Sequence, residues 1–287
     1  MRFKSIYFLL ISILLLCIHS NSFAVSVIEV DQAKIRLSIV PGSAKAGSIK
    51  LNNPTSEPKH IKTYLQDWSY LPAFDGTKEF KPAGATALSA AGWISFAPND
   101  FTISPFGKQI INYTVKVPQD AKGGHYSVMF FENYISDQNP PKEGVNVGVS
   151  IRIASLFYIE PEGTIIKDVG IEDLKVKKHE GGFEVAAKLV NRSNADIITK
   201  GSFFAMDKNG VVQARGEFNN VYMFGGDAAV LSGVWKESLL PGDYDLVISV
   251  DIGAGLTELG LGSGPVITKE SKIHIDNEGN IEEGETK

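Results

Sequence analysis

The chain has 287 residues, of which 43% are hydrophobic and 21% charged, and its formal net charge is −5. This acidic balance argues against nucleic acid and anionic membrane surfaces as partners, because both would repel the chain. The length suits two domains of roughly 100 to 130 residues, each large enough to bury a hydrophobic core.

The first residues have the pattern of a secretory signal peptide. Arg2 and Lys4 precede an apolar run from Ile6 to Ile18, and Ser22-Phe23-Ala24 places small residues where a signal peptidase cleaves. The apolar run is shorter than the roughly 20 residues of a membrane span. We therefore expect a signal peptide over residues 1–24, export across the inner membrane and a periplasmic location, with the cell surface as the second choice.

The chain that remains after cleavage has no cysteine, because Cys17 is the only one in the sequence. Stability must then come from burial without disulfides, although the compartment permits them. The mature chain has 26 basic and 33 acidic residues, a net charge of −7. No later run is apolar enough to span a bilayer.

Residues 25–160 predict an antiparallel β-sandwich. Short runs rich in Val, Ile, Tyr and Phe recur about every ten residues, and Gly, Pro, Asn and Asp separate them. The expected strands cover 33–40, 47–53, 59–70, 93–98, 108–118, 125–135 and 145–159. The segment from Leu71 to Ala91, rich in Ala, Gly, Thr and Pro, is expected to form a long loop with at most a short helix.

The first strand changes phase along its length. Ile28 and Val30 share one parity, whereas Ile35, Leu37 and Ile39 share the other. Because side chains alternate between the two faces of a strand, this shift predicts a kink near residues 31–33. At the kink the strand would leave one sheet and join the other.

The last strand of this domain has one wholly β-branched face. Val145, Val147, Val149, Ile151 and Ile153 alternate with small or polar residues. One interpretation is an ordinary half-buried strand whose valines face the core. The other is an open strand edge along which a second polypeptide adds as a further strand. The sequence leaves both open.

Residues 161–275 predict a second sandwich, with a domain boundary in the stretch Ile159-Glu160-Pro161-Glu162-Gly163. The expected strands cover 169–179, 182–193, 198–207, 211–218, 229–239, 242–253 and 273–275. Residues 276–287 form an acidic tail that is expected to fray. The fold class is therefore all-β, with two Ig-like antiparallel β-sandwich domains in tandem.

No residue pattern in the sequence indicates a catalytic site. The histidines His60, His125, His179 and His274 stand alone, so no metal site and no cofactor are expected. Nucleophile elbow, P-loop and dinucleotide motifs are missing, and the glycine-rich stretch 250–264 shows no helix that would receive a phosphate. The aromatic residues of the strands are expected in buried cores rather than on a sugar platform; they are Trp68, Tyr70, Trp93, Phe96 and Trp235.

Three stretches resemble the first domain of the PapD-like periplasmic pilus-assembly chaperones. They are VDQAKIRLSIVPGSAKAGSIKLNNPTSEP (30–58), FTISPFGKQIINYTVKVPQDAKGGHYSVMFFENY (101–134) and SLFYIEP (155–161). The resemblance implies a non-enzymatic chaperone whose last first-domain strand completes the sheet of a client. Val145, Val147, Val149, Ile151 and Ile153 would then form the client-binding strand. The implied partners are a pilin-like or other secreted subunit and an outer-membrane assembly protein.

The family also anchors the terminal carboxylate of its client through an Arg and a Lys. The Lys position is Ser155 here, and Lys34, Arg36 and Arg152 are the nearby candidates for a carboxylate anchor. A second hypothesis is a structural or adhesive cell-surface protein, because the stretch from Trp93 to Phe131 is also similar to WxL-type surface proteins.

Overall fold

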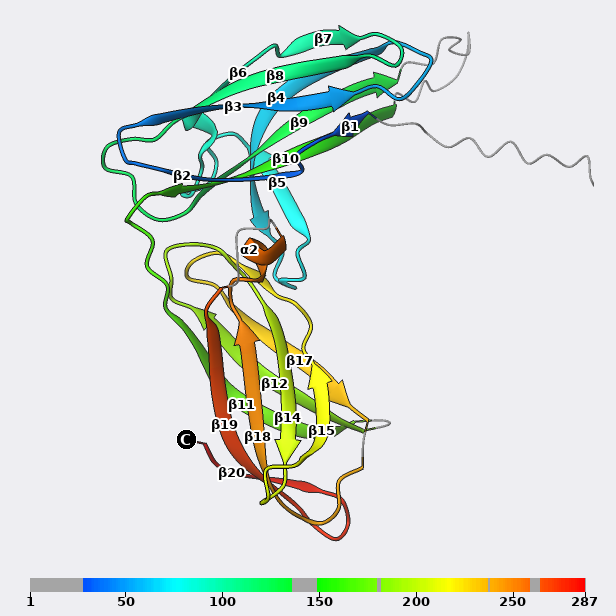
Figure 1. Ribbon diagram of the computed structural model, residues 1–287, viewed down its shortest axis with the longest axis vertical. Coiled ribbons are helices and arrows are strands. Elements are labelled where there is room, and N and C mark those ends of the chain that lie inside the picture. The colour runs from blue at the N-terminus through cyan, green and yellow to red at the C-terminus, as the bar shows by residue number, and fades with distance from the viewer. Residues whose placement is uncertain (1–27, 136–148, 180–181, 237, 259–263, 287) are drawn as a thin grey trace, which may run out of the picture.

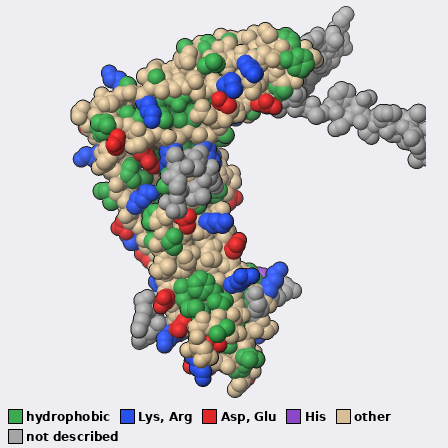
Figure 2. Space-filling view, viewed as in Figure 1, with side chains coloured by type: hydrophobic (Ala, Val, Ile, Leu, Met, Phe, Trp, Pro, Cys, Tyr) green, Lys and Arg blue, Asp and Glu red, His purple; other side chains and the backbone are tan. Residues whose placement is uncertain are grey.

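The computed structural model describes residues 28–135, 149–179, 182–236, 238–258 and 264–286. Its strands form two β-sandwich domains, the first lying across the top of the view and the second extending downward from it (Figure 1). The predicted all-β fold class is confirmed. On the face seen in Figure 2, basic and acidic side chains are interspersed. No helix in the described ranges has the length and apolarity of a membrane span.

The first sandwich packs a four-stranded sheet, in the order β1-β3-β8-β6, against a sheet in the order β2-β10-β9-β4-β5, to which β7 adds beside β4. A 3-10 helix, η1, covers Ala91–Trp93. The strands are β1 (Glu29–Val30), β2 (Lys34–Ile39), β3 (Ala44–Asn52), β4 (Lys59–Tyr70), β5 (Lys78–Pro82), β6 (Ile94–Ala97), β7 (Asp100–Ile103), β8 (Lys108–Lys116), β9 (His125–Ile135) and β10 (Val149–Pro161).

Alternating apolar side chains build the core between these two sheets. In β8, Ile111, Tyr113 and Val115 are buried while the residues between them face solvent. This period of two is what a strand with one solvated face requires. Phe157 and Ile159 of β10 are fully buried in the same core.

The predicted kink of the first strand is confirmed. β1 pairs antiparallel with β3, from Glu29↔Asn52 to Val30↔Leu51. After residues 31–33 the chain enters the other sheet, where β2 pairs parallel with β10, from Lys34↔Leu156 to Ile39↔Pro161. This is the only parallel strand pair among the described strands, and all others are antiparallel.

The prediction of a long loop over residues 71–91 was wrong in part. β5 lies within it and pairs with β4 from Tyr70↔Lys78 to Gln66↔Pro82, so the segment starts with a hairpin. Its turn holds Phe74 and Gly76 at positive φ. β5 escaped prediction because it is a short edge strand whose one large apolar side chain, Phe80, is 40% exposed.

The second sandwich packs a three-stranded sheet, β11-β12-β17, against a five-stranded sheet, β15-β14-β18-β19-β20, with a small β13-β16 pair beside them. Its core includes the fully buried Trp235 and Phe203. The elements are β11 (Val169–His179), β12 (Gly182–Asn191), β13 (Ile197–Ile198), β14 (Lys200–Met206), β15 (Val212–Glu217), β16 (Tyr222–Met223), β17 (Ala228–Trp235), β18 (Gly242–Asp251), α2 (Ala254–Glu258), β19 (Val266–Ile275) and β20 (Ile281–Thr286).

Two predictions for this half need correction. The acidic tail does not fray over its described part, because β20 pairs with β19 from Ile275↔Ile281 to Ser271↔Thr286. The glycine-rich stretch contains the five-residue helix α2, which lies at the junction of the two sandwiches (Figure 1). The domain boundary after Glu160 stays a prediction, and it falls one residue before the end of β10.

Candidate functional site: the open edge of β10

β10 is paired on one side along most of its length and on the other side along only half. β9 follows it from Val149↔Ile135 to Ile159↔His125. β2 begins only at Leu156, whose backbone N–H donates to the carbonyl of Ala33 at 2.9 Å. In the described part of the chain, the edge from Val149 to Ala154 therefore faces no strand. β1 lies close to this end of β10 but is hydrogen-bonded to β3 in the other sheet.

The hydrogen bond between Leu156 and Ala33 also fixes which backbone groups of β10 point out of the open edge. In a strand, the N–H and C=O of alternate residues point to the same side. Because the N–H of Leu156 points toward β2, those of Ser150, Arg152 and Ala154 point to the open side. The intervening residues, including Ile151 and Ile153, turn their backbone groups toward β9.

The β-branched side chains of β10 lie on the face that continues into the core. Ile153 is half-buried and packs against the core of the first sandwich, and Ile151 is also half-buried. Val145 and Val147 lie outside the described residues, as does the side chain of Val149. The aliphatic face is thus partly buried, and it is the backbone edge that is open. Client binding by these five residues stays a prediction.

The opposite face of β10 carries an arginine beside aromatic rings. The Arg152 guanidinium carbon lies 4.8 Å from the centroid of the Phe130 ring, and its Nη1 is 3.5 Å from the Tyr64 hydroxyl. Phe80 of β5 packs edge-on against Phe130 at 4.9 Å. Ser150 donates a hydrogen bond to Glu132, which is the main reason that the pKa of this carboxyl is lowered. Arg152 is exposed at the open edge, as a carboxylate anchor requires.

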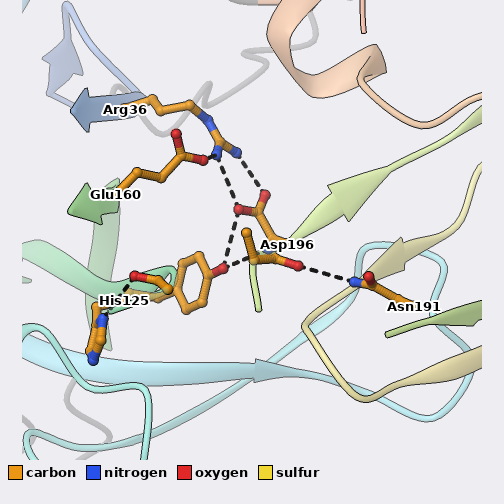
Figure 3. A network of polar contacts seen from close by, with 8 residues as sticks. Arg36, His125, Glu160, Asn191 and Asp196 are labelled. Carbon is orange, nitrogen blue, oxygen red and sulfur yellow. Dashed lines mark hydrogen bonds and ion pairs between the residues drawn. The ribbon is translucent and has the colours of Figure 1, made fainter. Parts of the chain in front are cut away.

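Arg36 has a different role from the one considered for it. Its Nη2 lies 2.6 Å from Asp196 Oδ2 and its Nη1 lies 3.1 Å from Asp196 Oδ1, while Glu160 forms a second ion pair (Figure 3). The side chains of Arg36 and Asp196 are only 8% and 1% exposed. Burial opposes the charge of Arg36, but the two carboxylates outweigh it and raise its pKa. Since both carboxylates already hold this guanidinium, the geometry argues against Arg36 as an anchor.

The Arg36 network belongs to a packed junction between the sandwiches. The Tyr126 hydroxyl accepts a hydrogen bond from the Asp196 N–H at 2.7 Å and lies 3.2 Å from its Oδ1. The Tyr126 ring stacks on Phe224 of the second sandwich with centroids 4.3 Å apart. The Gly124 N–H donates to the Asn194 carbonyl at 2.7 Å, and the Tyr126 hydroxyl occupies the space that a side chain at Gly124 would need.

The predicted burial of the strand aromatics is confirmed for Trp68, Tyr70 and Trp235, which are at most 9% exposed. Trp68 and Tyr70, however, lie in this junction rather than inside the first sandwich. Both contact Phe224, at 4.9 and 5.0 Å between ring centroids. Phe224 carries no signal in the sequence, because it lies between predicted strands.

Lys78 lies on the same face of the sheet as Lys34, although the sequence did not indicate it as a candidate anchor. Ile35, Leu37 and Ile39 of β2 point into the core, so Lys34 is on the outer face. Lys78 of β5 lies over the rings of Trp68 and Tyr70, 5.4 Å from each centroid. Burial, and then the charge of Lys34, lower the pKa of Lys78. Lys78 was missed because it lies in the segment that was predicted to be a loop.

Comparison with known proteins gives a structural resemblance. No protein-family model and no curated protein matches the sequence. The Class 5 fimbriae chaperone CfaA is similar with a TM-score of 0.48 and 12% identity over 85% of this chain and 98% of that one. A chain of the complex of Salmonella enterica SafA pilin with the SafB chaperone gives 0.41 and 12%, over 84% and 95%.

A chain of the CsuC–CsuE chaperone–tip adhesion subunit complex from Acinetobacter baumannii gives a TM-score of 0.42 and 11% identity, over 84% of this chain and 97% of that one. The resemblance to PapD-like fimbrial chaperones that the sequence indicated is therefore also found between structures. All three TM-scores are below 0.5.

Proposed function

We propose that this protein is a non-enzymatic, chaperone-like protein of the periplasm that binds an extended segment of a secreted client by β-strand addition. The observation that carries the proposal is the edge of β10, which has β9 on one side and no described strand beside Val149–Ala154 on the other. A pilin-like subunit is the client class that the sequence resemblance implies, and an outer-membrane assembly protein is the second partner.

The open edge has the chemistry that strand addition needs. Ser150, Arg152 and Ala154 each offer one N–H and one C=O, and an added strand would pair with all of them. A net contribution of about 1 kcal/mol per hydrogen bond makes backbone pairing a substantial part of the affinity. An unpaired strand edge otherwise invites aggregation, so a partner for it is expected.

The cations on the outer face fit the end of such a client. Arg152 lies on the open edge itself, and Lys34 and Lys78 lie on the same face of the sheet. We propose Lys34 and Arg152 as contacts of a client carboxylate, with Lys78 adding to the positive charge. Arg36 is left out, because Asp196 and Glu160 hold it.

The test removes one backbone donor from the open edge. Arg152→Pro deletes the outward N–H without touching the hydrogen bonds to β9, and edge strands accept proline at such positions. Arg152→Ala is the matched control, because it loses the same side chain but keeps the N–H. Wild type and both variants are used to capture proteins from periplasmic extract, the client is identified by mass spectrometry, and its affinity is measured.

We expect Arg152→Pro to bind the client about tenfold more weakly than Arg152→Ala, the effect of one lost hydrogen bond in a desolvated interface. The difference between wild type and Arg152→Ala measures the anchor separately. Equal thermal unfolding midpoints establish that both variants are folded. If Arg152→Pro and Arg152→Ala bind the client equally, the edge is not the binding site and the proposal fails.

A further inference from the structure

A second unpaired strand edge lies in the C-terminal sandwich. β20 pairs with β19 only as far as Ser271↔Thr286, so that Val266–Glu270 of β19 extend beyond the end of β20. These residues pair with β18 on their other side, from Asp251↔Val266 to Val247↔Glu270. Among the described strands nothing pairs with them on the side of β20. Figure 1 shows β11 and β19 next to each other in this part of the molecule.

A groove of about 640 Å³ begins where β20 stops. One wall is formed by Val169, Gly170 and Ile171 of β11, and the other by residues 267–270 of β19. β11 is itself an edge strand, which pairs only with β12 in the described part of the chain. The groove therefore lies between two strand edges, and its volume falls in the usual range of binding sites.

Lys269 gives the groove a positive charge. Ser271, Ile273 and Ile275 of β19 are buried, so alternation turns Lys269 and Ile267 to the same inner side, whereas Glu270 is exposed on the other. The half-buried Lys269 donates from Nζ to the Ile171 carbonyl at 3.0 Å. No carboxylate of the described residues forms an ion pair with it. An ammonium has three donors, so Lys269 retains capacity for a carboxylate.

β20 shows what kind of segment pairs with this edge of β19. It runs antiparallel along β19 and has the sequence IEEGET, an aliphatic residue among acidic ones. The groove continues along β19 from the end of β20. Its lining includes aliphatic side chains from Val169, Ile171 and Ile267, the ammonium of Lys269 on the inner side, and the carboxylate of Glu270 on the exposed side.

We propose that this groove binds an extended acidic segment of a partner protein, which adds as a strand along Val266–Glu270. A carboxylate of the segment pairs with Lys269, and an aliphatic side chain next to it packs on Ile171 and Ile267. This site is independent of the β10 edge, which is in the other sandwich. The protein would thus hold one chain on each sandwich.

The test uses capped synthetic peptides of about six residues, enough to span the open part of β19. Both peptides alternate valine and threonine, and one carries a central glutamate where the other carries a lysine. Amide NMR spectra of the full chain are recorded during titration. We expect the acidic peptide to shift the amides of residues 266–270 and 169–171 with a Kd of about 1 mM or below, and the basic peptide to bind about tenfold more weakly.

Lys269→Glu should reverse this preference. Lys272→Glu is the matched control, because Lys272 is on the same strand but exposed on the other face. Thermal unfolding establishes that both variants are folded. The proposal fails if neither peptide shifts these amides, if both bind alike, or if Lys272→Glu has the same effect as Lys269→Glu. It also fails if ultracentrifugation finds self-association that Lys269→Glu abolishes, because the occupant would then be a second copy of this chain.

Discussion

His125 makes the stability of the first sandwich sensitive to acid. Its ring lies 4.2 Å from the ring of Trp93, and its Nδ1 is 3.2 Å from the carbonyl of Gly123. Burial lowers the pKa of His125, so the folded chain resists a proton that the unfolded chain takes up near pH 6.5. The stability that the neutral ring contributes is therefore complete above about pH 6.5 and is lost as the pH falls toward the folded-state pKa.

We expect His125→Phe, which keeps a ring against Trp93, to lose less free energy of unfolding than wild type between about pH 6.5 and 5. Urea unfolding over this pH range measures the difference. His274→Gln serves as the control, because the hydrogen bond that His274 donates to Asp243 raises the pKa of His274, so that its contribution to stability has the opposite sign. A His125→Phe variant with the full acid sensitivity of wild type would refute this explanation.

At the residue scale, Arg36 shows a contact that could not be predicted from the sequence. Arg36 was a candidate anchor because the chaperone family that the sequence resembles uses an Arg at this part of the chain, and alternation along β2 does place Arg36 on the outer face next to β10. Its main partner, Asp196, is 160 positions away in the chain. Neither periodicity nor spacing reports a contact between two domains. The position of a charged side chain could therefore be predicted, but not whether its charge was already neutralised.

At the scale of elements, the sequence predicted long strands well and short edge strands poorly. β4, β9 and β11, of 11 or 12 residues each, have the predicted bounds; β4 and β9 carry many β-branched or aromatic residues, whereas β11 carries only Val169, Ile171 and Val176. β5 and β20 were missed, since Lys, Glu and Pro dominate them and their order comes from pairing with a longer neighbour. Propensity describes a strand alone, whereas an edge strand depends on its partner.

β10 illustrates the same limit at the candidate site. The alternation of β-branched and small or polar residues in β10 could be recognised in the sequence, and the β-branched face does continue into the core. Whether the backbone edge is open depends on where β2 begins to pair, and that point is set by the change of sheet at residues 31–33. The phase shift predicted this change, but not that pairing starts as late as Leu156.

At the scale of the whole molecule, the junction fixes the two sandwiches relative to each other. The buried pair Arg36–Asp196 and the Tyr126–Phe224 stack join residues from both halves. Removing Asp196 leaves the buried Arg36 with only its ion pair to Glu160, and breaking a buried ion pair costs about 3 kcal/mol. We therefore expect a single substitution in the junction to cause a large loss of stability.

We expect Asp196→Ala to lower the free energy of unfolding by about 3 kcal/mol and the thermal midpoint with it, measured by calorimetry. The matched control is Asp168→Ala, which breaks the exposed pair with Arg192 and should cost much less than the loss of Asp196. If the two substitutions cost the same, the Arg36 network does not hold the junction together.

The most direct test of the open edge is hydrogen exchange of individual amides in β10, read by NMR with and without the client. In the free protein, the amides of Arg152 and Ala154 should exchange rapidly, while those of Ile151 and Ile153, which point toward β9, should be protected. Adding the client should protect Arg152 and Ala154 as well. Protection of these two amides in the free protein, or no change on adding the client, would contradict strand addition at this edge.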